Sequence, residues 1–211
     1  MNDQGRKDLV VLVPCKNMQY SIEALLGRPQ AFGIRQPVHD VRVHPKRDPG
    51  VFGQCHDFLR PFLRSHSYAL ALCDREGCGR EGRPREKLEA DMEERLRQNG
   101  WEGRSAAVVL DPELEVWFWS DSPYVREALG WKQAQPAVSD WLEQRNYLRS
   151  GQRKPARPKE AVQEALRLSK KPRSSSVYFE LAQNVSFEHC SDPAFGKFKT
   201  VLERWFALEA Q

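Results

Sequence analysis

Short apolar runs and helically spaced apolar residues alternate along the first half of the chain. Four runs predict β-strands, over residues 8–13, 38–43, 68–73 and 105–110. The first reads DLVVLV and ends at Pro14, a pattern typical of a strand that is buried on both faces. Helical spacing lies between the strands, over residues 20–26, 54–64 and 85–99. Strands that alternate with helices need crossover connections, so we expect an α/β fold with a four-stranded, mainly parallel sheet flanked by helices.

After residue 110 the pattern becomes helical. Asp111-Pro112 has the residue types of a helix start, with Asp as the cap and Pro at the first helical position. Helices are predicted over residues 112–120, 123–129, 138–147, 158–169, 176–184 and 194–208. The pattern therefore predicts an α/β core over residues 1–120 and a helical extension over residues 121–211 that packs on it.

Composition narrows the class of protein. The 211 residues are 40% hydrophobic and 10% aromatic, enough for a buried core, which excludes a long disordered chain. The longest apolar runs fall well short of the roughly 20 residues that cross a bilayer, and the first residues lack an apolar secretory segment. Five scattered cysteines favour reduced thiols over a disulfide framework. We expect a cytoplasmic protein with no membrane partner.

Basic residues are concentrated in one segment. The net charge is only +4, but residues 145–173 hold ten basic residues against two acidic ones, a local charge of +8. A basic segment on a mildly acidic body predicts contact with a polyanion, DNA rather than RNA. The predicted nucleic-acid-binding residues are Arg145, Arg149, Arg153, Lys154, Arg157, Lys159, Lys170, Lys171 and Arg173. The alternative, weighted equally, is a solvated linker and helix face.

Carboxylates follow two of the predicted strands. Asp74 and Glu76 lie in the turn DREGCG after the third strand, and Glu113 follows the fourth strand in DPELE. Ligands of open parallel sheets bind at the carboxyl ends of the strands. Mg²⁺ favours one or two carboxylates with waters and phosphate oxygens, so these side chains predict a magnesium site. The alternative is that Asp74 caps a polar loop and Glu76 is solvated.

Three segments carry a resemblance to a known family. They read CDREGCGREG at 73–82, VVLDPELEVWFWSD at 108–121 and DPAFGKFKTVLERW at 192–205. Together with the strand and helix order they resemble the Toprim fold, and more closely a family of small bacterial Toprim-like proteins found in phage-defence contexts. The most specific resemblance is to the Toprim-like component of a methylation-associated defence system. It implies an anti-phage role beside other proteins of the same system.

The resemblance assigns roles to particular residues. Asp74 and Glu76 match the acidic pair that holds Mg²⁺ in Toprim enzymes, and Glu113 matches a further carboxylate of the small relatives. Toprim enzymes also carry a glutamate after the first strand, which acts as general acid or base and as a metal ligand. That loop here reads Pro-Cys-Lys-Asn at 14–17, and the nearest carboxylate is Glu23. Either Lys16 neutralises the acidic residues without a metal, or Lys16 faces solvent and Glu23 or Glu113 supplies the ligand.

Three functions remain open from the sequence. The first is a Mg²⁺-dependent, nuclease-like phosphoryl-transfer enzyme with the acidic residues as ligands and the basic segment on the nucleic-acid backbone. The second is a catalytically degenerate Toprim-like subunit that binds nucleic acid or partner proteins in a defence complex. The third is a protein scaffold whose basic segment docks an acidic partner.

Overall fold

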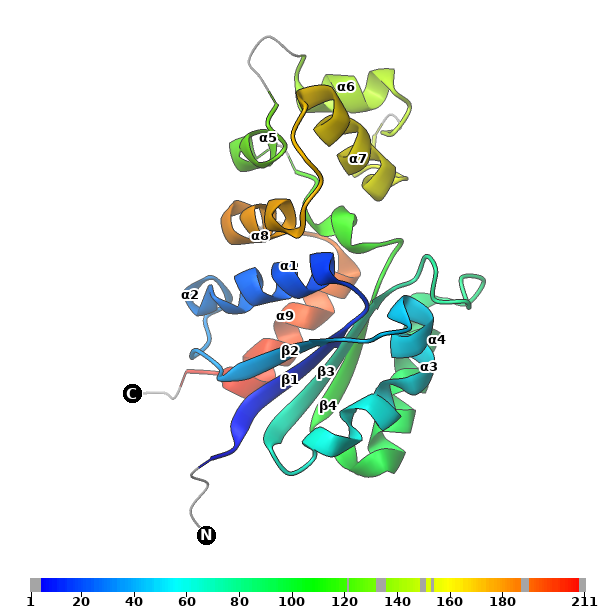
Figure 1. Ribbon diagram of the computed structural model, residues 1–211, viewed down its shortest axis with the longest axis vertical. Coiled ribbons are helices and arrows are strands. Elements are labelled where there is room, and N and C mark those ends of the chain that lie inside the picture. Colours follow the sequence, from blue (N-terminus) through cyan, green and yellow to red (C-terminus); the bar gives the residue numbers. More distant parts are fainter. Residues whose placement is uncertain are drawn as a thin grey trace.

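Four parallel strands form one sheet at the centre of the molecule (Figure 1). The computed structural model describes residues 5–120, 122–131, 136–148, 151–152, 154–186 and 190–208. The strands are β1 (Lys7–Val13), β2 (His39–Val43), β3 (His66–Asp74) and β4 (Ser105–Leu110), in the order β2-β1-β3-β4. Every neighbouring pair is parallel. The predicted α/β class with a four-stranded parallel sheet is confirmed.

The apolar run of β1 explains its central position. Leu9, Val11 and Val13 belong to the hydrophobic cluster on one face of the sheet, and Val10 and Leu12 to the cluster on the other. All five side chains are fully buried. Only a strand that is apolar on both faces can occupy this place, because helices cover the sheet on both sides.

Helices sandwich the sheet in two layers. The helices of the α/β half are α1 (Lys16–Leu26), α2 (Pro29–Phe32), α3 (Arg47–Leu59) and α4 (Arg85–Leu96), with short turns η1 (Arg60–Phe62) and η2 (Arg97–Trp101). In Figure 1, α3 and α4 lie on one face of the sheet, while α1 and the C-terminal helix lie on the other. The chain is therefore a three-layer α/β/α sandwich around two hydrophobic clusters.

The second half of the chain is helical, as predicted. Its elements are η3 (Leu114–Trp117), α5 (Pro123–Ala128), α6 (Val138–Gln144), α7 (Pro158–Ser169), α8 (Ser175–Asn184) and α9 (Pro193–Phe206). Helix α8 lies against α1, where the Ser175 hydroxyl donates to Asn17 Oδ1 at 2.9 Å. Across the described residues, none of the helices is both long and apolar enough to cross a membrane.

The last helix, α9, returns to the sheet and joins the two halves. Phe198 is fully buried, with its ring centroid 5.9 Å from that of Phe32 and 5.5 Å from that of Trp117. Near the other end of α9, Trp205 stacks on Tyr68 of β3 at 4.7 Å. The hydrophobic cluster on this face thus draws side chains from both the α/β half and the helical half.

The predicted helix over residues 112–120 is wrong. The structure has only the four-residue 3-10 turn η3 there, preceded by Glu113 in an extended conformation with φ −161°. The backbone N–H of Leu114 donates to Asp74 Oδ1 at 2.9 Å. Asp74 of β3, instead of the neighbouring Asp111, therefore receives the first N–H of the turn, and this long-range contact overrides the local helix signal.

Replacing Phe198 with Ala should destabilise both halves together. The substitution removes a buried aromatic ring that contacts both halves, so we expect a loss of about 3–5 kcal/mol in the free energy of unfolding. Chemical denaturation followed by circular dichroism and tryptophan fluorescence should give one shifted transition. Lys199→Ala, on the exposed side of the same helix, should change stability by about 0.5 kcal/mol or less. Two separate transitions, of which only one shifts, would contradict a shared core.

Candidate functional site

Four carboxyl groups gather at the carboxyl edge of the sheet. Asp74 is the last residue of β3, Glu113 and Glu115 follow β4, and Asp48 lies in the first turn of α3, after β2. Asp74, Glu113 and Glu115 are 7%, 4% and 2% exposed, and Asp48 is half-buried. Acidic side chains are rarely buried to this degree unless each is paired. We call these four residues the carboxylate cluster.

Asp74 connects three segments of the chain. Its backbone N–H donates to Asp48 Oδ1 at 2.8 Å, and its own Oδ1 accepts the Leu114 N–H at 2.9 Å. Alternation along β3 places Asp74 on the same face as Leu70 and Leu72, the side on which the helical half packs. The β3 terminus, the α3 start and the η3 turn are thus fixed around one carboxyl group.

Burial and like charge both act against ionisation of this cluster. Desolvation raises the pKa of Asp74 well above its usual value, and the charges of Asp48 and Glu115 raise it further. Burial also raises the pKa of Asp48, although the Asp74 N–H that Asp48 accepts acts in the opposite direction. The fold therefore keeps acidic groups close together where water does not stabilise their charge.

Lys159, in the first turn of α7, supplies an ammonium to the cluster. Its Nζ donates to Glu113 Oε2 at 2.8 Å, and its backbone N–H donates to Glu113 Oε1 at 3.2 Å. Burial lowers the pKa of Lys159, but the bond to Glu113 and the charges of Glu115 and Asp74 outweigh burial and raise it. One ammonium thus faces four carboxyl groups, which leaves an excess of acidic groups.

Glu115 is the most deeply buried member of the cluster. Its Oε1 accepts the Tyr178 hydroxyl at 2.6 Å, whereas its Oε2 has no hydrogen-bond partner. Burial raises the pKa values of both Glu115 and Tyr178. A buried polar atom without a hydrogen-bond partner destabilises the fold. Native proteins keep such groups most often at functional sites.

The loop after β1 also reaches this edge. Cys15 occupies the N-cap position of α1 and is half-buried. Burial raises the pKa of the Cys15 thiol, and the charges of Asp74 and Asp48 raise it further. Lys16, by contrast, is exposed. The ammonium that pairs with the cluster is therefore that of Lys159, and Lys16 lies at the surface.

Two other sequence-predicted residues lie apart from this pairing. Glu23 is 40% exposed, and its carboxylate lies 2.9 Å from His39 Nε2 at the start of β2. That position is toward the opposite end of the strands from Asp74. Glu76 is exposed, and its backbone N–H donates to Pro112 O at 3.0 Å. The structure thus brings Asp74 together with Glu113 and also with Asp48 and Glu115, which the sequence did not single out.

Several cations of the basic segment are used inside the protein. Lys159 pairs with Glu113, Lys171 pairs with Glu180 at 2.7 Å, and Lys154 donates to the Val116 carbonyl oxygen at 2.6 Å. The predicted cations at the surface are Arg145, which also lies 3.5 Å from Glu164, and Arg157, Lys170 and Arg173. Arg149 and Arg153 lie outside the described residues. The segment therefore offers solvent less positive charge than its composition suggests.

Exposed cations lie on the strand connections at this edge of the sheet, and among them only Lys16 was singled out from the sequence. Lys16 follows β1, Lys46 and Arg47 follow β2, and Arg80 follows β3, and all four are exposed. In a parallel sheet these connections share one edge, which is also the edge of the cluster. The signal was present in the sequence, because each cation lies within a few residues of a predicted strand end.

The cluster meets the needs of a magnesium ion only in part. Within the described ranges, no three His, Cys, Asp or Glu side chains converge in a metal-ligand arrangement. Glu113 already uses both oxygens on Lys159. Mg²⁺ needs only one or two carboxylates, however, and keeps several waters. Asp48 and Asp74 are the candidates for this requirement, because the Asp74 N–H donates to Asp48 Oδ1 and holds the two residues together.

Comparison with known proteins identifies no relative of this chain. The chain matches no protein-family model, no curated protein and no solved structure.

Replacing Asp74 with Asn should stabilise the metal-free protein. Asn keeps an oxygen for the Leu114 N–H but removes a buried negative charge beside Asp48, so we expect a gain of about 1–2 kcal/mol at pH 7. Thermal unfolding in the presence of EDTA should show a melting temperature higher by about 2–8 °C. Glu76→Gln, at the exposed position, should leave it unchanged within about 1 °C. A lower melting temperature for Asp74→Asn would mean that the carboxylate is a structural requirement.

The Glu23–His39 pair should stabilise the fold in a pH-dependent way. The hydrogen bond to Glu23 raises the pKa of His39, against burial, which lowers it. The contribution is complete below about pH 6.5, the usual His value, and is lost as pH rises through the higher folded-state pKa. His39→Gln should therefore cost up to about 1 kcal/mol at pH 6 and less at pH 8.5, since solvent screens the exposed Glu23. Urea denaturation at both pH values tests this, and a pH-independent difference would contradict it.

Proposed function

We propose that this protein is a Mg²⁺-dependent, nuclease-like phosphoryl-transfer enzyme that acts on nucleic acid. The observation that carries the proposal is the carboxylate cluster, in which Lys159 is the ammonium facing four largely buried carboxyl groups. Burial raises the pKa of Asp74, repulsion from its acidic neighbours raises it further, and a bound cation would relieve that repulsion. The cluster also occupies the edge of the sheet where parallel α/β folds bind ligands.

Asp48 and Asp74 are the residues that would hold the metal ion. They are joined through the Asp74 N–H; Asp74 ends β3, and Asp48 lies in the first turn of α3, after β2. When bound, Mg²⁺ would polarise a phosphoryl oxygen and neutralise developing charge. Toprim enzymes place a glutamate after the first strand, where this chain has Cys15 and Lys16. Asp48, after the second strand, would supply the carboxylate that this loop lacks.

Lys159 and the edge cations would position the phosphate backbone. Lys159 is bonded to Glu113, and its ammonium lies close enough to Asp74 for their charges to interact. The exposed side chains of Lys16, Lys46, Arg47 and Arg80 provide positive charge on the connections that surround the cluster. This arrangement suits DNA, whose backbone is held by Lys and Arg through charge and whose affinity falls steeply with salt.

The resemblance supplies the biological setting of the proposal. A chain of this pattern resembles the small Toprim-like proteins of bacterial phage defence. We therefore place it in the cytoplasm as a component of an anti-phage system, beside partner proteins of the same system. The four-stranded parallel sheet and its acidic carboxyl edge are compatible with that resemblance.

A second candidate is a catalytically degenerate subunit that binds nucleic acid or partner proteins. Two observations favour it. Both oxygens of Glu113 are already held by Lys159, and the β1 loop presents Cys15 and Lys16 where Toprim enzymes have a glutamate. Such a subunit would keep the cations of the edge and bind DNA without breaking a bond.

The two candidates are separated by a nuclease assay with matched variants. The full-length protein is incubated with plasmid DNA, single-stranded DNA and RNA in Mg²⁺, in Mn²⁺ or in EDTA. The enzyme predicts cleavage that requires the metal and that falls at least about 100-fold in Asp48→Asn and in Asp74→Asn, because each removes a metal ligand. The control is Glu76→Gln, which also removes a carboxylate but at an exposed position. It should retain activity within about twofold.

Calorimetry with Mg²⁺ and a salt titration of DNA binding complete the test. Metal binding that is lost in Asp74→Asn supports the enzyme. Salt-sensitive DNA binding without cleavage and without metal binding would support the degenerate subunit instead. Cleavage that persists unchanged in both Asn variants would overturn the assignment of the site.

A further inference from the structure

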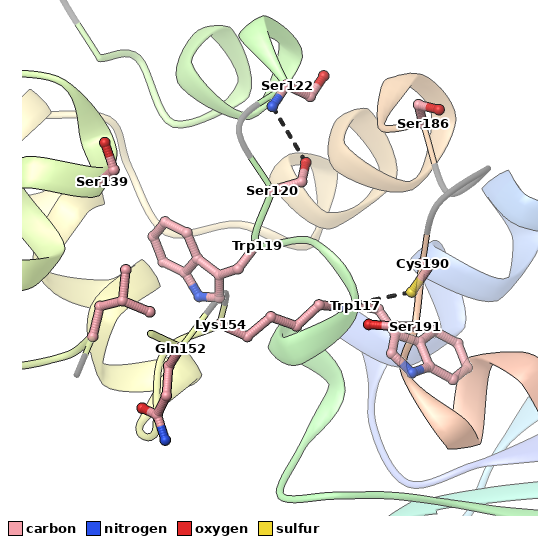
Figure 2. A pocket seen from close by; sticks show the side chains of 11 residues that line it. Trp117, Trp119, Ser120, Ser122, Ser139, Gln152, Lys154, Ser186, Cys190 and Ser191 are labelled. Atoms are coloured by element: carbon pink, nitrogen blue, oxygen red, sulfur yellow. Dashed lines mark hydrogen bonds between the residues drawn. The ribbon is translucent and has the colours of Figure 1, made fainter. Parts of the chain in front are cut away.

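Two hollows involve helices of the second half of the chain. The first, of about 800 Å³, is lined by residues that include Trp117, Trp119 and Lys154 (Figure 2). Both tryptophans are packed in the core, and the Lys154 ammonium is already held by the Val116 carbonyl oxygen and the Cys190 sulfur. The second is a groove of about 660 Å³ between α4 and α9, beside the start of β4. This groove borders one edge of the sheet, where the side chains have a specific arrangement.

Strand β4 lies at the end of the sheet and pairs with β3 alone in the described structure. An edge strand presents backbone N–H and C=O groups that can pair with a strand of another chain. The other edge strand, β2, is short and carries Asp40 and Arg42, and charged side chains disfavour such pairing. In contrast, β4 reads SAAVVL, without a charge or a proline, which is the composition of segments that associate through strand pairing. This edge therefore needs protection from another part of the chain.

Two glutamates of α4 bind the backbone of this edge. The N–H of Ala107 donates to Glu93 Oε1 at 3.0 Å, and the N–H of Val109 donates to Glu89 Oε1 at 2.9 Å. Ala107 and Val109 are alternate residues of β4, so both N–H groups point to the same side, away from β3. Two strand residues span about 6.6 Å and one helical turn, from Glu89 to Glu93, spans about 6 Å, so the two spacings match. The carboxylates thus occupy the positions that the carbonyl oxygens of a fifth strand would take.

Lys197 of α9 joins the two carboxylates from the other layer of the fold. Its Nζ donates to Glu89 Oε2 at 3.1 Å and to Glu93 Oε1 at 2.7 Å. Because α4 and α9 lie on opposite faces of the sheet (Figure 1), these ion pairs pass around its edge. Arg85 also donates to Glu89 Oε1, at 2.6 Å, and Glu89 is only 3% exposed. Charge-assisted hydrogen bonds therefore hold both carboxylates against the strand.

We propose that Glu89, Glu93 and Lys197 prevent the sheet from being extended by a strand of a second copy of this chain. We call these three residues the edge cap. A second copy is the partner because its β4 has the same uncharged sequence, and a strand edge can pair with its own copy about a two-fold axis. Space for the incoming strand begins in the groove between α4 and α9, where Ser105 and Ala106 line the wall beside Glu93. The inference is independent of metal binding and of phosphoryl transfer at the carboxylate cluster.

Amide hydrogen exchange of the full-length protein tests the edge cap itself. In Glu93→Ala the Ala107 N–H loses its acceptor, so we expect its exchange, followed by NMR, to be at least about 10-fold faster than in the parent. Glu93→Gln keeps an oxygen for this N–H and loses only the charge that faces Lys197, so exchange should stay within about threefold of the parent. Glu94→Ala, at the neighbouring exposed position that pairs with Arg97, should leave the exchange of Ala107 unchanged.

Sedimentation velocity tests what the edge cap prevents. Glu89→Ala/Glu93→Ala should self-associate at least about 10-fold more tightly than the parent, with a fraction of dimers or larger species that rises with concentration. Adding Ala107→Pro should reverse this association, because proline is tolerated on an edge strand but has no N–H for the new pairing. Circular dichroism shows whether the double variant is folded. If it is not, Glu93→Ala alone, with and without Ala107→Pro, is measured with the same expectations.

Three results would overturn the inference. The first is Ala107 exchange that is the same in Glu93→Ala and in the parent, which would mean that the carboxylate does not protect this N–H. The second is a folded Ala variant that associates no more than the parent does at millimolar concentration, which would mean that the edge needs no protection. The third is association that survives Ala107→Pro, which would place the contact elsewhere on the surface.

Discussion

Three segments of the fold meet around one buried side chain, that of Asp74. Its N–H is held by Asp48 and its Oδ1 by Leu114, so the end of β3, the start of α3 and the turn after β4 meet around it. These hydrogen bonds explain how the fold can bury the group, but they do not explain why Asp48 and Glu115 surround it with further negative charge. Apolar or amide side chains at these positions would destabilise the fold less than buried carboxylates do. The presence of carboxylates there is the physical reason to regard this edge of the sheet as a functional site.

The sequence predicted the sheet well because its signal is local. The apolar run of β1 requires cover on both faces, and alternating helices provide that cover, so the α/β class and the four strands follow from pattern alone. The predicted strand over 105–110 has the bounds of β4. The helix predicted over 112–120 failed for the opposite reason, because its start depends on a hydrogen bond from Leu114 to Asp74, 40 residues away.

The difference between local and long-range determinants also explains which residues of the site could be predicted from the sequence. Asp74 and Glu113 could be identified because they directly follow apolar strands, and such residues share one edge of a parallel sheet. Asp48 and Lys159 reach that edge from the first turns of α3 and α7, whose placement depends on packing between distant segments. From the sequence, Lys16 was the one candidate for a neutralising ammonium, and its exposure to solvent was the alternative. The fold instead brings in Lys159, which is more than forty residues from its partner Glu113 along the chain.

Charge counted along the chain is a poor guide to charge presented to solvent. Lys154 and Lys159 both belong to the basic segment, yet both are bound to the single turn after β4, one to the Val116 carbonyl and the other to Glu113. The segment between them is therefore fastened to the α/β core at both ends. Part of its positive charge is thus paired with the carboxylate cluster, and part is held by a backbone carbonyl oxygen of the same turn. Further exposed positive charge lies on the strand connections, whose cations are scattered in sequence and brought to one edge only by the parallel sheet.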